Sequence, residues 1–81
     1  MTPDQCRAAR GLANISQEEL AKAARVGLST VRNFEAGRSV PVANNLAAMV
    51  KAIEDAGVIL IPENGGGAGV RLRKGGQDGA G

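Results

Sequence analysis

Apolar residues recur at helical spacing in four stretches of the first 56 residues. Cys6 and Ala9 share one face of the first stretch, and Val31 and Phe34 share one face of the third. The fourth stretch is the longest, and its apolar residues keep helical spacing as far as Ala56. The pattern therefore predicts helices over Pro3–Leu12, Gln17–Ala24, Leu28–Ala36 and Val42–Ala56.

The ends of these helices carry recognisable start and stop signals. Thr2 and Gln5 stand three residues apart, as a capping box requires, and Pro3 suits the first helical position. Ser16 and Glu19 form a second box of the same spacing. The expected breaks are glycines, which adopt backbone conformations that are costly for other residues: Gly27, Gly37 and Gly57.

The pattern changes after Gly57. Val58–Pro62 is short and rich in β-branched residues, and Val70–Arg73 alternates apolar with charged side chains, so both segments are predicted to be strands. The connection between them, residues 63–69, is glycine-rich and expected to be flexible. The sequence predicts a mainly α fold with a helical domain over 1–57, a β extension over 58–74 and a disordered tail over 75–81.

Composition agrees with a single small helical domain. A chain of 81 residues has room for one domain, and its 43% hydrophobic content comes almost wholly from aliphatic residues, with Phe34 the single aromatic. The formal charge of +2 is too small to indicate nucleic acid by itself. Its distribution is more informative, because Arg25, Arg32 and Arg38 lie in a stretch with one acid, Glu35.

Several kinds of chemistry are unsupported by the residues present. The chain has no histidine and one cysteine, Cys6, which argues against a Cys/His zinc site, a histidine-dependent nucleophile and an internal disulfide. Cys6 is expected to be a small buried apolar residue. No acid pair lies in a pocket-like apolar context, so neither an enzyme nor a cofactor is predicted. Neither a signal peptide nor a membrane span is recognised, and a cytosolic protein without membrane contact is expected.

The second and third predicted helices, joined by a tight turn, form a helix-turn-helix arrangement. The small side chain of Ala21 lets the two helices approach closely. Once Val31 and Phe34 are packed inward, the opposite face of the third helix is free. That face carries Leu28, Ser29, Arg32 and Asn33.

At this point the chain resembles the lambda repressor/Cro-like family, also called the XRE family. The resemblance covers roughly residues 3–56, and it depends on Ser16-Gln17-Glu18-Glu19-Leu20-Ala21, Val26, Ser29-Thr30-Val31 and Phe34-Glu35-Ala36-Gly37. The family implies double-stranded DNA as the partner, with the third helix in the major groove. Matching positions carry the base-contacting role to Leu28, Ser29, Arg32 and Asn33.

Chemistry supports that transfer, because arginine bonds guanine and asparagine bonds adenine in the major groove. The family often has an amide residue or arginine at the first exposed positions of this helix. Leu28 differs, because its side chain can distinguish only the shape of the groove and the methyl groups in it. The resemblance further implies phosphate contacts by Gln17, Arg38 and Ser39, with Arg25 a weaker candidate because the family commonly has glycine at its position. For Gln17 an equal alternative is that it only takes part in capping the second helix and contacts no phosphate. The resemblance also implies a structural ion pair between Arg10 and Glu35.

The strand segments suggest a homodimer. Val58, Ile59, Leu60 and Ile61 are four consecutive apolar residues, and Val70 and Leu72 alone face them from the second strand, so a lone hairpin would leave apolar surface and an open edge. A second subunit would cover both and place two third helices about 34 Å apart on an inverted-repeat operator. The alternative is a hairpin folded back on its own domain, with dimerisation on DNA only.

A second function class keeps the same fold. An antitoxin or antiactivator would bind another protein instead of, or in addition to, DNA. Such a module would not need the basic and amide side chains of Arg32, Asn33 and Arg38, so DNA-binding transcriptional regulation, with a regulatory protein partner left open, is the preferred interpretation.

Overall fold

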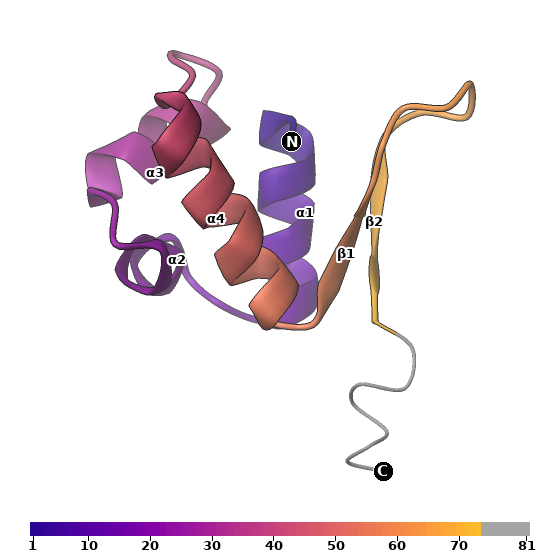
Figure 1. Cartoon of the computed structure of the whole chain (residues 1–81), viewed down its shortest axis with the longest axis horizontal. Coiled ribbons are helices and arrows are strands. Elements are labelled where there is room, and N and C mark those ends of the chain that lie inside the picture. Colours follow the sequence, from indigo (N-terminus) through magenta and orange to yellow (C-terminus); the bar gives the residue numbers. More distant parts are fainter. Residues whose placement is uncertain (74–81) are drawn as a thin grey trace, which may run out of the picture.

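The computed structural model describes residues 1–73. Four helices precede a two-stranded antiparallel hairpin (Figure 1). The elements are α1 (Pro3–Ala13), α2 (Gln17–Ala24), α3 (Leu28–Glu35), α4 (Ala43–Asp55), β1 (Val58–Ile61) and β2 (Gly69–Leu72). The predicted tail over 75–81 lies outside the described residues.

Every predicted helix and strand is present, with ends that shift by one residue. Helix α1 is one residue longer than predicted and α3 one shorter, and β2 begins at Gly69 instead of Val70. Both capping boxes are confirmed, since Thr2 and Ser16 accept the backbone N–H of Gln5 and Glu19 at 3.0 Å and the return bonds are also formed. Gly57 has φ +95°, which ends α4 without strain.

The core lies where the four helices meet. Its largest fully buried side chains are aliphatic, among them Leu20, Met49 and Ile53, and Phe34 adds the ring. Burial of aliphatic side chains contributes about 1.5–3 kcal/mol each, which is what holds helices this short in place. No helix within residues 1–73 has the length and apolar character that a membrane span requires.

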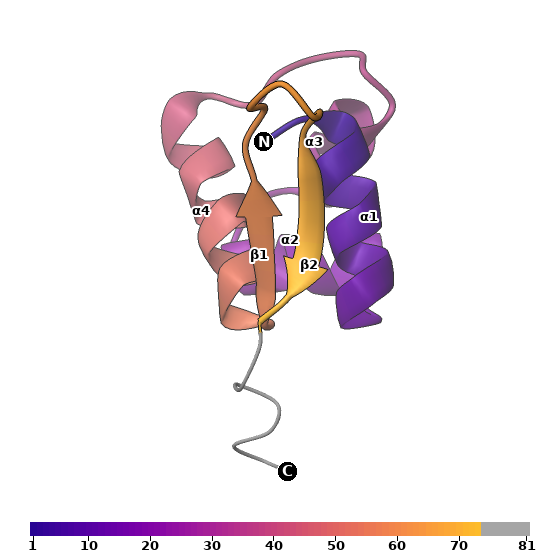
Figure 2. The ribbon, with the colours of Figure 1, turned by 90° about the vertical axis from the view of Figure 1, so that its right-hand side faces the viewer.

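The hairpin forms a separate layer over α1 and α4. Figure 2 shows β1 beside α4 and β2 beside α1. The register pairs Val58 with Leu72 and Leu60 with Val70. Val58 is fully buried, and Leu60 and Val70 pack against the helical core. The sequence predicted these three side chains to contribute to a dimer interface. Helices α1 and α4 of the same chain cover the face of the hairpin on which they lie, and their contact with a second copy stays a prediction.

Gln5 fastens the hairpin to α1. Its side chain is only 6% exposed, and its Nε2 donates to the carbonyl oxygens of Ile61 at 2.9 Å and Gly69 at 3.0 Å. The connecting loop is also organised, since one carboxylate oxygen of Glu63 accepts the N–H groups of Gly65 and Gly67. The loop expected to be merely flexible thus has internal hydrogen bonds.

Candidate nucleic-acid interface

Helix α3 separates a buried face from a polar one. Val31 and Phe34 enter the core, while Ser29 and Arg32 are exposed and Asn33 is half-buried. The side chains of this polar face offer a hydroxyl, a guanidinium and an amide within five consecutive positions, the groups that bond base edges in the major groove. Leu28, at the start of the helix, is partly buried and packs against the core. Only part of its side chain is available to a ligand.

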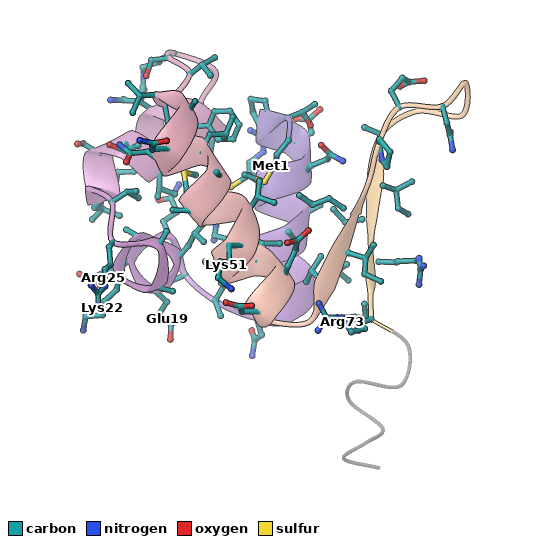
Figure 3. The ribbon with its side chains drawn as sticks, viewed as in Figure 1. Met1, Glu19, Lys22, Arg25, Lys51 and Arg73 are labelled. Atoms are coloured by element: carbon teal, nitrogen blue, oxygen red, sulfur yellow. The ribbon has the colours of Figure 1, made fainter. Side chains whose placement is uncertain are left out.

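The turn between α2 and α3 is tight because Arg25 adopts the left-handed conformation. Its φ and ψ are 58° and 44°, and its N–H donates to the carbonyls of Ala21 and Lys22. This conformation explains why glycine suits the position. Arg25 is exposed, and Figure 3 shows it beside Lys22, both pointing away from the helices. Sequence reasoning did not single out Lys22, which stands alongside Arg25 as a second exposed cation.

Helix α3 begins without a side-chain cap. Gly27 occupies its N-cap position and offers no acceptor, so the first N–H groups of the helix have no side-chain partner. Exposed N–H groups and the positive end of a helix dipole favour a negatively charged ligand. Sequence analysis missed this feature, and the signal was the absence of Ser, Thr, Asp or Asn at that position.

A buried carboxylate ties the end of α3 to α1. Glu35 is 3% exposed, and both of its oxygens accept hydrogen bonds from the Arg10 guanidinium, Nε and Nη2, at 2.7 Å each. The pair is a planar fork, the strongest geometry for these two groups. Arg7 donates to the backbone carbonyl of Glu35 and also pairs with Asp4. Two arginines of α1 therefore hold the last residue of α3.

Two further donors complete the shell around Glu35. Gln17 Nε2 donates to one carboxylate oxygen at 2.9 Å, and Cys6 Sγ donates to the other at 3.1 Å. Burial raises the pKa of Glu35, but the hydrogen bonds from Arg10, Gln17 and Cys6 outweigh it and hold that pKa below its usual value. The hydrogen bond to Glu35 is in turn the main reason that the pKa of Arg10 is raised.

Cys6 is a structural thiol. Burial, followed by its hydrogen bond to Glu35, raises its pKa to about 12. A thiol that stays protonated is a poor nucleophile, so the expectation of an inert buried residue is confirmed by its zero exposure. Its role as a hydrogen-bond donor to Glu35 was not predicted, because the two residues are 29 positions apart.

Gln17 faces inward more than predicted. The side-chain amide bonds Glu35, so the donor expected for a phosphate is already engaged in part. Gln17 is the first residue of α2 and is half-buried. The contact links the start of α2 to the end of α3, which fixes the two helices of the motif relative to each other.

The loop after α3 carries the remaining predicted contacts. Arg38 and Ser39 are both exposed, and Arg38 Nη1 donates to Asn33 Oδ1 at 3.3 Å. The structure thus brings a predicted base contact and a predicted phosphate contact together. Oδ1 of Asn33 therefore already accepts one hydrogen bond within the protein.

The arrangement offers hydrogen-bond donors and positive charge. Among residues 1–73, no three metal-ligating side chains gather in one place. The exposed cations Arg25, Arg32 and Arg38 all belong to α3 or to the segments next to it. Such a surface suits a polyanion with hydrogen-bonding edges.

Two short helices at a tight turn, the second with a free polar face, define a helix-turn-helix DNA-binding module. A family model described as helix-turn-helix matches residues 7–54, more than half of the chain. The protein belongs to this family, whose lambda repressor/Cro-like (XRE) branch its sequence resembles, and it is a DNA-binding regulator of the XRE type. The family is one of DNA-binding regulatory domains and not of enzymes. A search of curated proteins found no match.

Proposed function

We propose that the protein is a sequence-specific transcriptional regulator that inserts α3 into the major groove of its operator. The observation that carries the proposal is the division of α3, with Val31 and Phe34 buried and Ser29 and Arg32 exposed. A helix that served only packing would not need such a free polar face held rigidly by its other side. Rigid presentation limits the entropy lost on binding.

Within this proposal, Ser29, Arg32 and Asn33 contact base edges. Arg32 would bond guanine O6 and N7 in a fork, whereas Asn33 would donate through its amide nitrogen alone when Arg38 keeps its oxygen. Leu28 supplies a smaller apolar contact from the part of its side chain that remains accessible.

Phosphate contacts would come from the edges of the motif. Arg25, Arg38 and Ser39 are exposed on both sides of α3 and suit this role. Gln17 is proposed to contribute mainly through the start of α2, since its amide already bonds Glu35. These groups orient the protein on the backbone without distinguishing sequences.

We further propose that the protein acts as a homodimer on an inverted repeat. A single α3 contacts few base pairs, whereas two copies related by a two-fold axis contact half-sites about 34 Å apart. The apolar residues that the hairpin leaves outside the helical core support a second copy at this layer. Ile59, Ile61 and Leu72 are in this position, with Leu72 the most exposed.

The test is a gel-shift or anisotropy titration with DNA from upstream of the protein's own gene, against an excess of random competitor. Specific binding that survives the competitor supports the proposal, and equal affinity for all sequences contradicts it. Arg38→Ala should weaken binding to specific and random DNA alike and flatten the salt dependence, whereas Gln17→Ala should weaken binding to both without changing the salt dependence, because glutamine carries no charge. A change of base preference in Gln17→Ala would contradict its assigned role.

A further inference from the structure

The hairpin has one open edge, and it belongs to β2. The N–H of Arg73 donates to the carbonyl of Gly57 at 2.7 Å, and the register pairs Val58 with Leu72. In an antiparallel pair, successive residues direct their backbone groups alternately toward the partner and away from it. The backbone groups of Val70 and Leu72 therefore point away from β1.

The corresponding edge of β1 is obstructed at both of its ends. Val58 is fully buried, next to the end of α4, so its backbone is inaccessible to another strand. Pro62 follows directly after β1 and has no N–H to donate. The edge of β2 is therefore the more accessible one for an added strand.

The surroundings of the β2 edge include two exposed leucines and a groove. Leu72 is 47% exposed and Leu12, on the neighbouring helix α1, is 41% exposed. A groove of about 340 Å³ runs between α1 and β2. It is lined by Thr2, Asp4, Gln5, Ala8, Ala68, Gly69 and Val70. Apolar side chains beside unpaired backbone groups favour association with another strand.

We infer that this edge pairs with the same edge of a second copy, β2 against β2 in antiparallel orientation, so that the dimer contains a continuous four-stranded sheet. The inference rests on the proposed function, because it assigns the interface of the proposed DNA-binding dimer. Val70 of each chain stands opposite Val70 of the other, on the two-fold axis. The interface adds Leu72 and the exposed side of α1 around Ala8 and Leu12.

Charge selects this register. With Val70 at the axis, Arg71 lies opposite Gly69 of the second copy and Leu72 lies opposite Ala68. A shift that centres the pair on Arg71 places two guanidinium groups directly opposite each other, and like charges in that position destabilise a sheet. A centre at Leu72 brings Arg71 opposite Arg73, with the same penalty. The Val70 register is the one that joins apolar residues and separates the arginines.

The symmetry agrees with DNA binding. Two identical antiparallel strands in one sheet are related by an axis normal to the sheet, because opposite residues point to the same face. The helices of both copies therefore lie on the same side of the four-stranded sheet. Figure 1 shows α2 and α3 at the far end of the molecule from the hairpin, with α1 and α4 between. Both copies of α3 then face one side, where a single DNA duplex can contact them.

The register predicts a specific cross-link. Val70→Cys places two thiols opposite each other at the axis, within the distance that a disulfide spans, whereas Leu72→Cys places its thiols four residues apart, about 13 Å. Under mild oxidation Val70→Cys should form a covalent dimer and Leu72→Cys should not, although residue 72 is the more exposed. Native Cys6 does not interfere, since it is fully buried. Equal cross-linking of the two variants would overturn the register.

The dimer itself is tested by light scattering of the full chain at tens of micromolar. The parent should be a dimer, and Leu72→Asp should raise its dissociation constant at least about tenfold, a change of about 1.4 kcal/mol. Val40→Asp is the matched control, because Val40 is 75% exposed in the loop after α3, away from the hairpin. The dissociation constant of the Val40→Asp dimer should equal that of the parent. If Leu72→Asp leaves the dissociation constant unchanged, the interface lies elsewhere, such as at the groove along α4 lined by Leu46 and Val50.

The same samples separate this inference from the proposed function. Leu72→Asp should still distinguish a specific half-site from random DNA, but it should lose the extra affinity for the inverted repeat. A monomeric parent that binds specific DNA overturns the dimer interface and leaves the role of α3 intact. A dimeric parent that binds all DNA sequences equally leaves the dimer interface intact and overturns the proposed role of α3.

Discussion

Arg10 and Glu35, 25 residues apart, are joined by two hydrogen bonds of 2.7 Å that connect α1 to the last residue of α3. The carboxylate is 3% exposed and the arginine side chain 20%. Gln17 and Cys6 donate to the same carboxylate from two other positions. The orientation of α3 thus depends on one buried charge and the four donor atoms that bond it.

Removing either partner should destabilise the fold strongly. Arg10→Ala leaves Glu35 buried without its cation, and breaking a buried pair from one side costs about 3–5 kcal/mol. Because Arg10 is partly exposed, we expect a loss of unfolding free energy toward the lower end of that range. Urea titration measures it. Lys51→Ala, which breaks the exposed pair with Asp55, is the control and should cost less than about 1 kcal/mol. Equal losses in the two variants would contradict a special role for the buried pair.

Glu35 should also give the protein an acid limit. Its pKa is lowered in the folded state, so the unfolded chain binds the proton more readily and stability rises with pH in that range. The contribution is complete above the unfolded pKa of about 4.3 and is lost as pH falls through the lower, folded pKa. Thermal melts from pH 7 to pH 3 should show this loss in the parent. Glu35→Gln should have lower stability at pH 7 and a flatter acid dependence, and a parallel decline would contradict the assignment.

Local signals in the sequence predicted the elements well. The capping boxes at Thr2 and Ser16 lie within four consecutive residues, and the periodic burial of α3 follows from its own sequence. The break between α2 and α3 was expected at Gly27, but Gly27 is extended, with φ −69°, and Arg25 adopts the left-handed conformation instead. The capping boxes and the periodic burial depend on neighbours in the chain, which is why they are visible without a structure.

Long-range partners could not be predicted in the same way. Gln5 was assigned to a capping box, and it does form one, but its amide also bonds carbonyls 56 and 64 residues away. The inward side of the hairpin is a related case. Alternation shows that Val58 and Leu60 share a face, but only the packing shows that α1 and α4 of the same chain cover it.

One substitution tests the hydrogen bonds from Gln5 to the hairpin separately from its capping role. Gln5→Glu keeps the oxygen that accepts the Thr2 N–H and removes the amide donor, so a carboxylate faces the carbonyls of Ile61 and Gly69. We expect a loss of about 1–3 kcal/mol at pH 7, the range for a buried group left unsatisfied. Acidic pH should recover part of it, since the protonated acid can donate again. Glu19→Gln in the exposed second box is the control and should change little. Hydrogen exchange in β1 and β2 should increase only in Gln5→Glu.

The proposed base contacts predict a loss of specificity without a loss of fold. Arg32 is exposed and does not belong to the core, so Arg32→Ala should leave the melting temperature nearly unchanged. Loss of a forked contact to guanine should cost about 1–3 kcal/mol for the specific site and little for random DNA. Asn33→Ala should act similarly at another base pair. Competition binding with single-base substitutions locates each contact, and an unchanged preference in both variants would reject the assignment.

Arg25 separates a backbone effect from a ligand effect. Its φ of 58° is unfavourable for a residue with a side chain, by about 1–2 kcal/mol, so Arg25→Gly should raise the unfolding free energy by about 1 kcal/mol. Asn14 caps α1 at nearly the same φ, 59°, and asparagine tolerates this conformation, so Asn14→Gly should give a smaller gain. If Arg25 contacts phosphate, the glycine variant should bind all DNA more weakly despite its greater stability, with a salt slope reduced by about one ion. If affinity is unchanged while stability rises, Arg25 has no phosphate contact and its side chain is solvated.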